Sequence, residues 1–336
     1  MVGEFPRNVG GHTSNHAPVS ATVSTYAEDG KVLSLIVLGW NMLNHCDPTN
    51  NPFKVAESGA DYVARKVKQL EFLAEQMKSG IFDCVALQEV DIFTQAPMPE
   101  FVRNFLSEVR AEGWQNTHTE QADNTREPFL TFYNTAKLEF VSKEAVFPMS
   151  GTLKNCGFEA TFKYADTDNL VCINNIHLDY KTDFRETILK YQKQKIADGK
   201  FTIIVGDANH LPEIEYYSLV GDKVNRPTSI NSKQHLQLTD GFMASPATNQ
   251  RVVITEGPLV AFFEWVPANL LSKLLTRNDD ENERSGKFVC NTIILKPNER
   301  LPYGLHVSPS GEPWIAHSHK DQLLSPDIGP QTKQSY

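Results

Sequence analysis

The sequence has no long apolar run and no clustered cysteines. Its longest apolar runs, residues 33–40 and 258–263, are far shorter than the roughly 20 residues that a membrane-spanning helix needs. The N-terminus also lacks the apolar core of a secretory signal. The five cysteines include no Cys-x-x-Cys pair, which argues against a zinc cluster. We therefore expect buried free thiols in an intracellular, reducing compartment.

Several common catalytic signatures are absent as well. The chain contains no Walker loop and no Gly-x-Gly-x-x-Gly, His-Glu-x-x-His or Gly-x-Ser-x-Gly pattern. Excess basic charge is absent too, since the formal net charge is −9. Broad binding to long nucleic acids relies on basic surface, so this charge argues against it. A small nucleotide, or a nucleic-acid end in a local basic cleft, stays compatible with the charge.

What the chain does have is the composition of a soluble globular protein. It contains 336 residues, of which 40% are hydrophobic and 22% charged. That length can bury a large core as one unit. Residues 1–28 are rich in Gly, Ser, Thr, Asn, His and Pro, and we predict a flexible tail there. Residues 29–336 are predicted to form one domain, with an apolar insertion at about 245–285.

Hydrophobic periodicity predicts many strands with a few helices between them. Residues 61–78 are predicted to form an amphipathic helix, with Gly80 as its stop. The apolar face of this helix carries Val63, Val67, Leu70, Ala74 and Met77. A charged helix is predicted over 183–197, and strands over 32–38, 82–87, 129–133, 158–164, 170–176, 202–205, 252–255 and 288–295. This order favours a layered α/β or α+β fold.

Polar residues stand directly beyond four of the predicted strands. Asn41, Glu89 and His177 each follow such a strand, and Asp207 and Asn209 follow another. Catalytic and ligand-binding groups collect at strand ends, because the sheet holds them rigidly. Any one of these residues on its own is best explained as a turn residue. Four such positions in one chain favour a shared functional site.

The chemistry of these residues is mutually consistent. Asn41 and Glu89 offer the hard oxygen ligands that suit Mg²⁺, with Mn²⁺ as the alternative. Asp207 could orient or deprotonate an attacking water. Asn209 and His177 could donate hydrogen bonds to charge that develops on a phosphate. Such a site would hydrolyse a phosphoester with a metal as Lewis acid.

The motifs around these residues resemble the endonuclease/exonuclease/phosphatase superfamily. They occur in family order as Trp40-Asn-Met-Leu43, Leu87-Gln-Glu-Val-Asp91, Ile176-His-Leu178 and Gly206-Asp-Ala-Asn209. The second and fourth motifs, and the helix after His177 with Arg185, look most like the deadenylase and nocturnin branch. The resemblance implies a four-layer sandwich of two packed β-sheets flanked by helices.

The resemblance also implies roles for these residues. Asn41 and Glu89 would hold the metal, and His177 would contact the phosphate. Asp207 and Asn209 would manage the attacking water and the transition state. Arg185, in the helix after His177, would contact the substrate.

The C-terminal third departs from the family pattern. Asn291 occupies the position at which the family has a strand Asp, and we predict that Asn291 binds the substrate. The terminal Ser-Asp-His motif falls near residues 318–322 in one of two registers. One register takes Asp321 as the family Asp, with catalytic and metal-binding roles, and puts Gln322 where the His belongs. The other keeps His319 as the phosphate-contacting histidine.

Two further residues have competing interpretations. Tyr133 follows a predicted strand and could face the substrate, but packing in the core or at the rim competes with that role. Asp240, in the segment Leu-Thr-Asp-Gly, is predicted to be a turn residue, with a substrate-facing role as the alternative.

The sequence therefore predicts a Mg²⁺-dependent phosphoester hydrolase that acts on a nucleotide or an RNA 3′ end. One alternative is a non-catalytic binding protein on the same fold, because Asn291 and Gln322 replace the expected Asp and His. Another is a phospholipid or phosphoinositide phosphoesterase, in which the apolar residues 258–275 engage a membrane or a protein partner. Those apolar residues could equally pack on the body of the domain.

Overall fold

The structure is a computed structural model of the chain. It describes residues 14, 16, 18–27, 32–44, 58–120, 123–149, 152, 154–165 and 167–209, together with a set of strands after residue 209. Within these residues the fold consists of two large β-sheets and three α-helices.

The first sheet has six strands in the order β14-β1-β2-β3-β5-β4. Its only parallel pair joins β2 and β3, and every other neighbouring pair is antiparallel. The strands are β1 (Val19–Ala27), β2 (Val32–Asn41), β3 (Cys84–Gln88), β4 (Trp114–His118), β5 (Phe129–Asn134) and β14 (Gln250–Glu256).

The second sheet also has six strands, in the order β10-β13-β9-β8-β7-β6. Here the parallel pair joins β8 and β9, and the other neighbouring pairs are antiparallel. The strands are β6 (Leu138–Pro148), β7 (Asn155–Tyr164), β8 (Leu170–His177), β9 (Phe201–Asp207), β10 (Tyr217–Ser218) and β13 (Asp240–Ser245).

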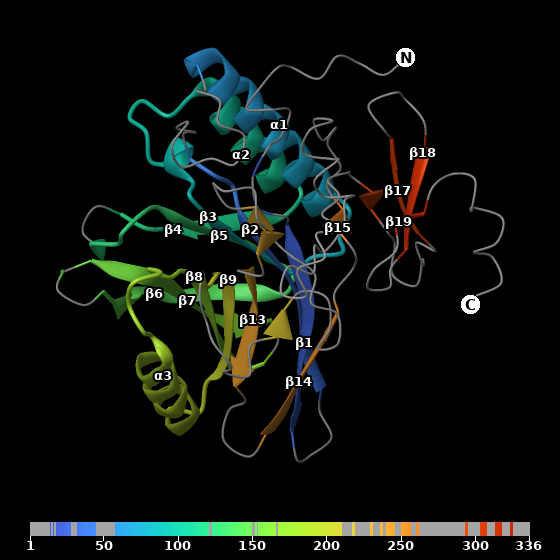
Figure 1. The fold of residues 1–336 in the computed structure, drawn as a ribbon. Coiled ribbons are helices and arrows are strands. Elements are labelled where there is room, and N and C mark those ends of the chain that lie inside the picture. The colour runs from blue at the N-terminus through green and yellow to red at the C-terminus, as the bar shows by residue number, and fades with distance from the viewer. Residues whose placement is uncertain are drawn as a thin grey trace.

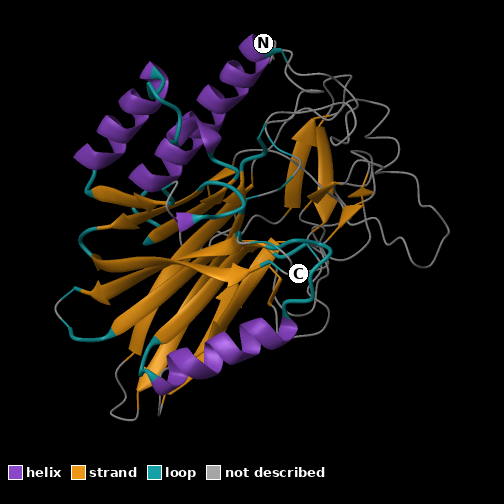
Figure 2. Cartoon of the chain, turned by 90° about the vertical axis from the view of Figure 1, so that its left-hand side faces the viewer, coloured by secondary structure: helices purple, strands orange, loops and turns teal. Residues whose placement is uncertain are grey.

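The two sheets pack face to face, with helices on the outer face of each (Figure 1, Figure 2). Helices α1 (Gly59–Lys78) and α2 (Glu100–Ala111) cover the first sheet, and α3 (Arg185–Ala197) covers the second. Three buried clusters fill the spaces between these four layers. The middle cluster joins the sheets through side chains such as Val37, Ala86, Ile173 and Val205. The predicted four-layer α/β sandwich is therefore confirmed.

Shorter elements complete the described chain. A 3₁₀ turn, η2 (Asp91–Phe93), follows β3. Two small sheets pair β11 (Ser229–Ile230) with β12 (Leu236–Gln237), and β15 (Val260–Ala261) with β16 (Ile293–Ile294). A three-stranded sheet contains β17 (Tyr303–Val307), β18 (Pro313–His317) and β19 (Leu323–Leu324), drawn in red in Figure 1.

The predicted flexible tail is wrong over residues 19–27, which form β1. This strand lies between β2 and β14 in the first sheet. Val19, Ala21 and Val23 alternate along it and are buried. That alternation of small apolar residues with Ser and Thr is a strand pattern, and the pairing on both sides satisfies its backbone.

Helix α1 matches the predicted range, but its buried face differs. Ser58 caps the helix by accepting a hydrogen bond from the Asp61 backbone N–H, and Gly80 follows the helix with a φ of 68°. Val63, predicted to be buried, is 43% exposed. In its place the helix buries Arg65 and Lys66, which apolar periodicity does not predict.

The described cysteines agree with the expectation of buried free thiols. Cys84, Cys156 and Cys172 are free and buried, whereas Cys46 and Cys290 lie outside the described residues. Across the described part of the chain, the helices are too short or too polar to span a bilayer.

Candidate functional site

Strand register brings three of the candidate residues into one row. In the second sheet His177 of β8 pairs with Asp207 of β9, and Asp207 pairs with Asp240 of β13. Directly paired residues present their side chains on the same face of a sheet. In the first sheet Asn41 of β2 pairs with Gln88 of β3, so Glu89 follows at the same level. All these positions lie at one end of the sandwich.

The side chain of Asn41 links the two sheets at this end of the sandwich. Its Nδ2 atom donates to Glu89 Oε1 at 3.0 Å and to Asp207 Oδ2 at 3.2 Å. Asn41 is fully buried, and Asp207 is 2% exposed. The structure thus brings Asn41, Glu89 and Asp207 together across both sheets, from positions up to 166 residues apart.

His177 contacts the same two carboxylates. Its Nε2 atom lies 3.5 Å from Asp207 Oδ2, and its Nδ1 atom lies 3.7 Å from Glu89 Oε1. The Nδ1 atom also forms an ion pair with Glu127, a residue that the sequence did not single out. Burial alone would lower the pKa of His177, but Glu127 and Asp207 outweigh burial and raise it to about 10.

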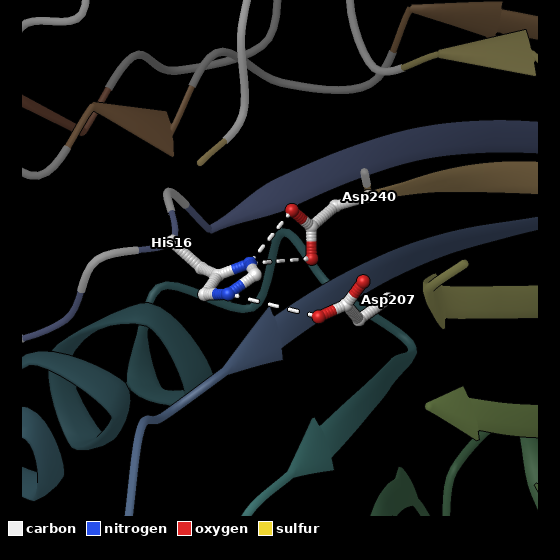
Figure 3. Close-up of side chains that lie close together, drawn as sticks. All are labelled: His16, Asp207 and Asp240. Carbon is white, nitrogen blue, oxygen red and sulfur yellow. Dashed lines mark hydrogen bonds and ion pairs between the residues drawn. The ribbon is translucent and has the colours of Figure 1, made fainter. Parts of the chain in front are cut away.

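His16 and Asp240 lie beside Asp207, as Figure 3 shows. His16 Nδ1 lies 2.9 Å from Asp240 Oδ2 and 3.2 Å from Oδ1, while His16 Nε2 lies 3.6 Å from Asp207 Oδ2. Burial would lower the pKa of His16, but Asp240 and Asp207 raise it to about 9. Asp240 is 1% exposed and begins β13, so its interpretation as a turn residue is wrong.

Asn209 lies beside Asp207 through two hydrogen bonds. Its backbone N–H donates to Asp207 Oδ1 at 2.9 Å, and its Nδ2 atom donates to the Leu178 carbonyl at 2.7 Å. Asn209, Glu89 and Leu43 all have positive φ values, of 53°, 56° and 52°. Left-handed backbone is unfavourable for residues other than glycine, and such strain concentrates at functional sites.

A buried amide network fixes the sheets directly beneath these residues. Gln88 Nε2 donates to Asn175 Oδ1 at 2.6 Å, which links β3 to β8. Asn175 Nδ2 donates to the carbonyls of Leu87 and Leu130 at 2.9 and 3.1 Å. Because these groups are buried and mutually bonded, they fix the separation and register of the two sheets below the carboxylates.

The segment after Asn41 also contributes to the site. The Leu43 N–H donates to Asn41 Oδ1 at 3.0 Å, and the Asn44 N–H donates to Glu89 Oε2 at 2.7 Å. Buried polar side chains of α1 donate hydrogen bonds to the backbone carbonyls of this segment. Arg65 donates to the carbonyls of residues 42, 43 and 44, Lys66 to those of 42 and 43, and Gln69 to that of 42.

We expect Arg65→Met to destabilise the protein. The substitution keeps the apolar stem but removes a charged donor that bonds three backbone carbonyls, one of them in a buried contact. Each hydrogen bond to a charged group contributes about 1.5–3 kcal/mol, so the free energy of unfolding should fall by at least about 2 kcal/mol. Urea unfolding measures this change. Arg110→Met, at an exposed position of α2, is the control; equal stability of the two variants would contradict the anchoring role of Arg65.

Of the two described residues that are predicted to bind substrate, Tyr133 lies in the core and Arg185 at the surface. Tyr133 pairs with Cys84, four residues before Gln88 along β3, and its ring packs on Phe162 in the middle cluster. Its hydroxyl donates to Gln115 Oε1 at 2.9 Å, so the structure favours the packing interpretation of Tyr133 over the role at the substrate. Arg185 begins α3 at the surface, where the Asp183 carboxylate binds its guanidinium.

Asn291, His319, Asp321 and Gln322 lie outside the described residues, as does most of the apolar segment 258–275. Their roles stay predictions. Strand β18, which precedes His319, Asp321 and Gln322, pairs with β17 and β19.

The cluster has the composition of a cation site. Glu89, Glu127 and His177 present ligand atoms within 4.8 Å of one another, and so do His16, Asp207 and Asp240. Four carboxylates share this region with two imidazoles, which leaves excess negative charge even when both imidazoles are protonated. Burial raises the pKa of Glu127 and of Asp207, so this negative charge is unfavourable as it stands. A divalent cation would offset that cost, so the donor set fits one.

Comparison with known proteins gave matches among solved structures alone. No family model matches the chain, and no curated protein sequence matches it. The matching structures number 62 chains. The catalytic domain of human nocturnin with bound sulfate is 18% identical, with 44% of this chain and 59% of that chain covered and a TM-score of 0.33.

Two further matches are of the same kind. An endonuclease/exonuclease/phosphatase family protein from Bacteroides thetaiotaomicron is 15% identical, covers 67% of this chain and 84% of its own, and has a TM-score of 0.41. ANGEL2, a 2′,3′-cyclic phosphatase, is 16% identical, covers 59% and 56%, and has a TM-score of 0.36. The family and branch that the motifs predicted are thus represented among the matching structures.

Proposed function

We propose that the protein is a phosphoester hydrolase that depends on a divalent cation, Mg²⁺ or Mn²⁺. The observation that carries this proposal is the shared environment of Glu89 and Asp207, whose carboxylates come from different sheets and accept hydrogen bonds from one Asn41 amide. His177 lies against both carboxylates. Hydrolysis of bis(p-nitrophenyl) phosphate that requires Mg²⁺ and stops on chelation tests the proposal.

In this proposal Asn41 and Glu89 hold the cation. Both offer oxygen atoms, which Mg²⁺ and Mn²⁺ prefer. When bound, the cation supplies Lewis-acid stabilisation of the phosphoryl oxygens. The Asn44 N–H and the Asn41 amide already fix both oxygens of the Glu89 carboxylate, so this ligand is oriented in advance.

Asp207 is proposed to act on the attacking water. The water oxygen forms a bond to phosphorus while the ester P–O bond breaks, and the ester oxygen leaves with the electron pair of that bond as an alkoxide or phenolate. The Asp207 carboxylate accepts the proton that the water loses. Burial raises the pKa of Asp207, partly countered by His177 and His16, which makes the carboxylate a better proton acceptor than an exposed one. The Asn209 N–H, bonded to Asp207 Oδ1, orients the carboxylate.

His177 is proposed to donate a hydrogen bond to the phosphoryl group. Glu127 and Asp207 raise its pKa against the effect of burial, so the imidazole is protonated near neutral pH. A protonated imidazole in a buried site stabilises charge on the phosphoryl oxygens as it develops.

A phosphorylated nucleotide or a nucleic-acid 3′ end is the proposed substrate class. Its support is the order and form of the motifs around Glu89 and Asp207, together with a net charge of −9 that disfavours long nucleic acids. The alternatives of a non-catalytic binder and a phospholipid enzyme depend on residues 258–275, 291 and 322, almost all of which lie outside the described residues.

We expect divalent cations to stabilise the wild-type protein against heat. A ligand at about 100 times its Kd adds about 2.7 kcal/mol of stability, which should raise the Tm by a few degrees. Differential scanning calorimetry with Mn²⁺, and with EDTA as the reversal, measures the shift. Glu89→Gln should lose most of the shift, and Glu139→Gln, at an exposed position of β6, should keep it. An equal shift in both variants would argue against Glu89 as a ligand.

A further inference from the structure

His16 occupies a place in the cluster that the proposed roles do not use. It lies 224 residues from its partner Asp240 in the sequence, and its side chain is 9% exposed. Its imidazole contacts Asp240 through Nδ1 and faces Asp207 through Nε2, as seen in Figure 3. A histidine buried among catalytic candidates needs an explanation beyond packing.

We propose that His16 is a catalytic residue that binds the phosphoryl group of the substrate, and that Asp240 is the positioning residue that orients it. The proposal rests on the proposed hydrolysis and extends it. It makes His16 and His177 two imidazole donors to the same phosphate.

The geometry of the two histidines supports this assignment, because they are held in the same way. Each has its Nδ1 atom against a buried carboxylate, which is Asp240 for His16 and Glu127 for His177. A carboxylate at Nδ1 fixes the ring orientation and keeps a proton on that nitrogen. The Nε2 atoms then both face Asp207 Oδ2, at 3.6 and 3.5 Å.

The N–H groups at Nε2 of both histidines can still donate a hydrogen bond to a ligand. A strong charge-assisted N–H to carboxylate bond measures about 2.7–2.9 Å, and both Nε2 distances are longer. Two N–H groups therefore converge beside Asp207 without being satisfied by it. A phosphoryl group carries several acceptor oxygens on one centre, so it can accept from both imidazoles at once while Asp207 addresses the water.

The backbone around His16 is also fixed to the site. Trp40 Nε1 donates to the His16 carbonyl at 3.0 Å, and the His16 N–H donates to Ser14 Oγ at 3.1 Å. Ser14 Oγ in turn donates to the Asn41 carbonyl at 2.8 Å. These contacts tie His16 to the end of β2, where the proposed cation ligand Asn41 lies. Such anchoring preorganises the imidazole for catalysis.

Steady-state kinetics of the full chain with Mg²⁺ test the assignment. His16→Ala should lower kcat for bis(p-nitrophenyl) phosphate by about 10²–10³-fold, as the loss of one donor to a developing oxyanion does. The loss should be the same for diesters with good and with poor leaving groups, because the contact is to the phosphoryl group. Added imidazole should restore part of the activity. His118→Ala, in β4 of the first sheet, is the control and should keep wild-type kcat.

Asp240→Asn separates positioning from contact with the substrate. It should lower kcat less than His16→Ala, and His16→Ala should add little further loss in the double variant, because both changes act through one imidazole. Wild-type kcat in His16→Ala would overturn the proposal. A loss that grows as the leaving group becomes poorer would overturn it too, since that pattern belongs to a proton donor to the leaving oxygen.

A binding measurement gives a readout that does not need turnover. In isothermal titration calorimetry of the Mg²⁺-loaded protein, inorganic phosphate should bind at least about tenfold more weakly to His16→Ala than to wild type. Mn²⁺ stoichiometry should be equal in the two proteins. Unchanged phosphate affinity, or the loss of one bound Mn²⁺, would overturn the proposal, the latter because it would make His16 a metal ligand.

The same experiments separate this inference from the proposed function. Absence of metal-dependent hydrolysis by the wild type contradicts the proposed function whatever His16 does. Hydrolysis that Glu89→Gln abolishes and His16→Ala leaves intact contradicts only the inference about His16. If His16→Ala fails to fold, His16→Gln takes its place, because glutamine keeps a side-chain N–H donor. This variant should fold and show a reduced kcat. A wild-type kcat in His16→Gln, measured without added imidazole, would contradict the proposed role of the His16 imidazole.

Discussion

Glu89→Gln and Asp207→Asn should each lower kcat/KM for Mg²⁺-dependent hydrolysis of bis(p-nitrophenyl) phosphate by about a thousandfold or more. Each substitution keeps the shape of the side chain and removes one negative charge. Loss of charge at Glu89 weakens the cation that stabilises the phosphoryl oxygens, and loss at Asp207 removes the proton acceptor for water. A thousandfold corresponds to about 4 kcal/mol of activation free energy.

Stability measured in parallel makes this result specific. The cluster holds four carboxylates against two imidazoles, so each substitution removes one of its excess negative charges and relieves their repulsion. We therefore expect the free energy of unfolding of Glu89→Gln and Asp207→Asn to change far less than the activation free energy. Glu139→Gln and Asp198→Asn, at exposed positions, should change neither quantity. Wild-type turnover by the site variants would remove the enzymatic interpretation.

Gly206→Ala should be the most destabilising single substitution at the site. Gly206 has a φ of 133°, which side chains rarely adopt, and an added Cβ atom would lie 2.2 Å from the Ile176 carbonyl oxygen. The same atom would lie 3.0 Å from Gln88 Nε2, which belongs to the amide network between the sheets. Unfavourable backbone costs about 1–3 kcal/mol, and overpacking a further 1–3 kcal/mol. We expect a loss of about 3 kcal/mol or more.

Urea unfolding of Gly206→Ala and Gly59→Ala measures the effect against a matched change. Gly59 begins α1 and has nothing within 4 Å of an added Cβ atom, so alanine there should be neutral or slightly stabilising. Because Asp207 follows Gly206 directly, Gly206→Ala should also lower kcat. A variant as stable as the wild type would show that the backbone at Gly206 can relax at no cost.

The sequence predicted the part of the site that strand ends define. Asn41, Glu89, His177 and Asp207 each follow a run of buried residues, and the parallel pairs β2–β3 and β8–β9 bring such ends to the same level. That inference needs only strand positions, which apolar runs mark well. It did not need the register between the two sheets.

The residues that the sequence missed or misassigned lack a local signal for their place in the cluster. His16 lies in a Gly-, Ser- and His-rich segment without periodicity, and its role depends on Asp240, 224 positions away. Asp240 stands in a Thr-Asp-Gly sequence that is typical of a turn, but pairing with β9 makes it a strand residue. Glu127 is assigned to the cluster only from the structure, through its ion pair with His177.

Two other differences have a tertiary cause. Helix α1 buries Arg65 and Lys66 because the segment after Asn41 presents its carbonyls to them, whereas periodicity assigns burial to apolar residues. Tyr133 follows the same kind of apolar run as Glu89, but β5 runs antiparallel to β3. Its end therefore lies at the opposite side of the sheet from the cluster.

Diffraction from crystals soaked in Mn²⁺ and inorganic phosphate tests the central claim most directly. An anomalous difference map should show a Mn²⁺ ion bound to the Glu89 carboxylate, with the phosphate between that ion and the imidazoles of His177 and His16. Mn²⁺ bound elsewhere on the protein, or phosphate that leaves both imidazoles without contact, would contradict the account.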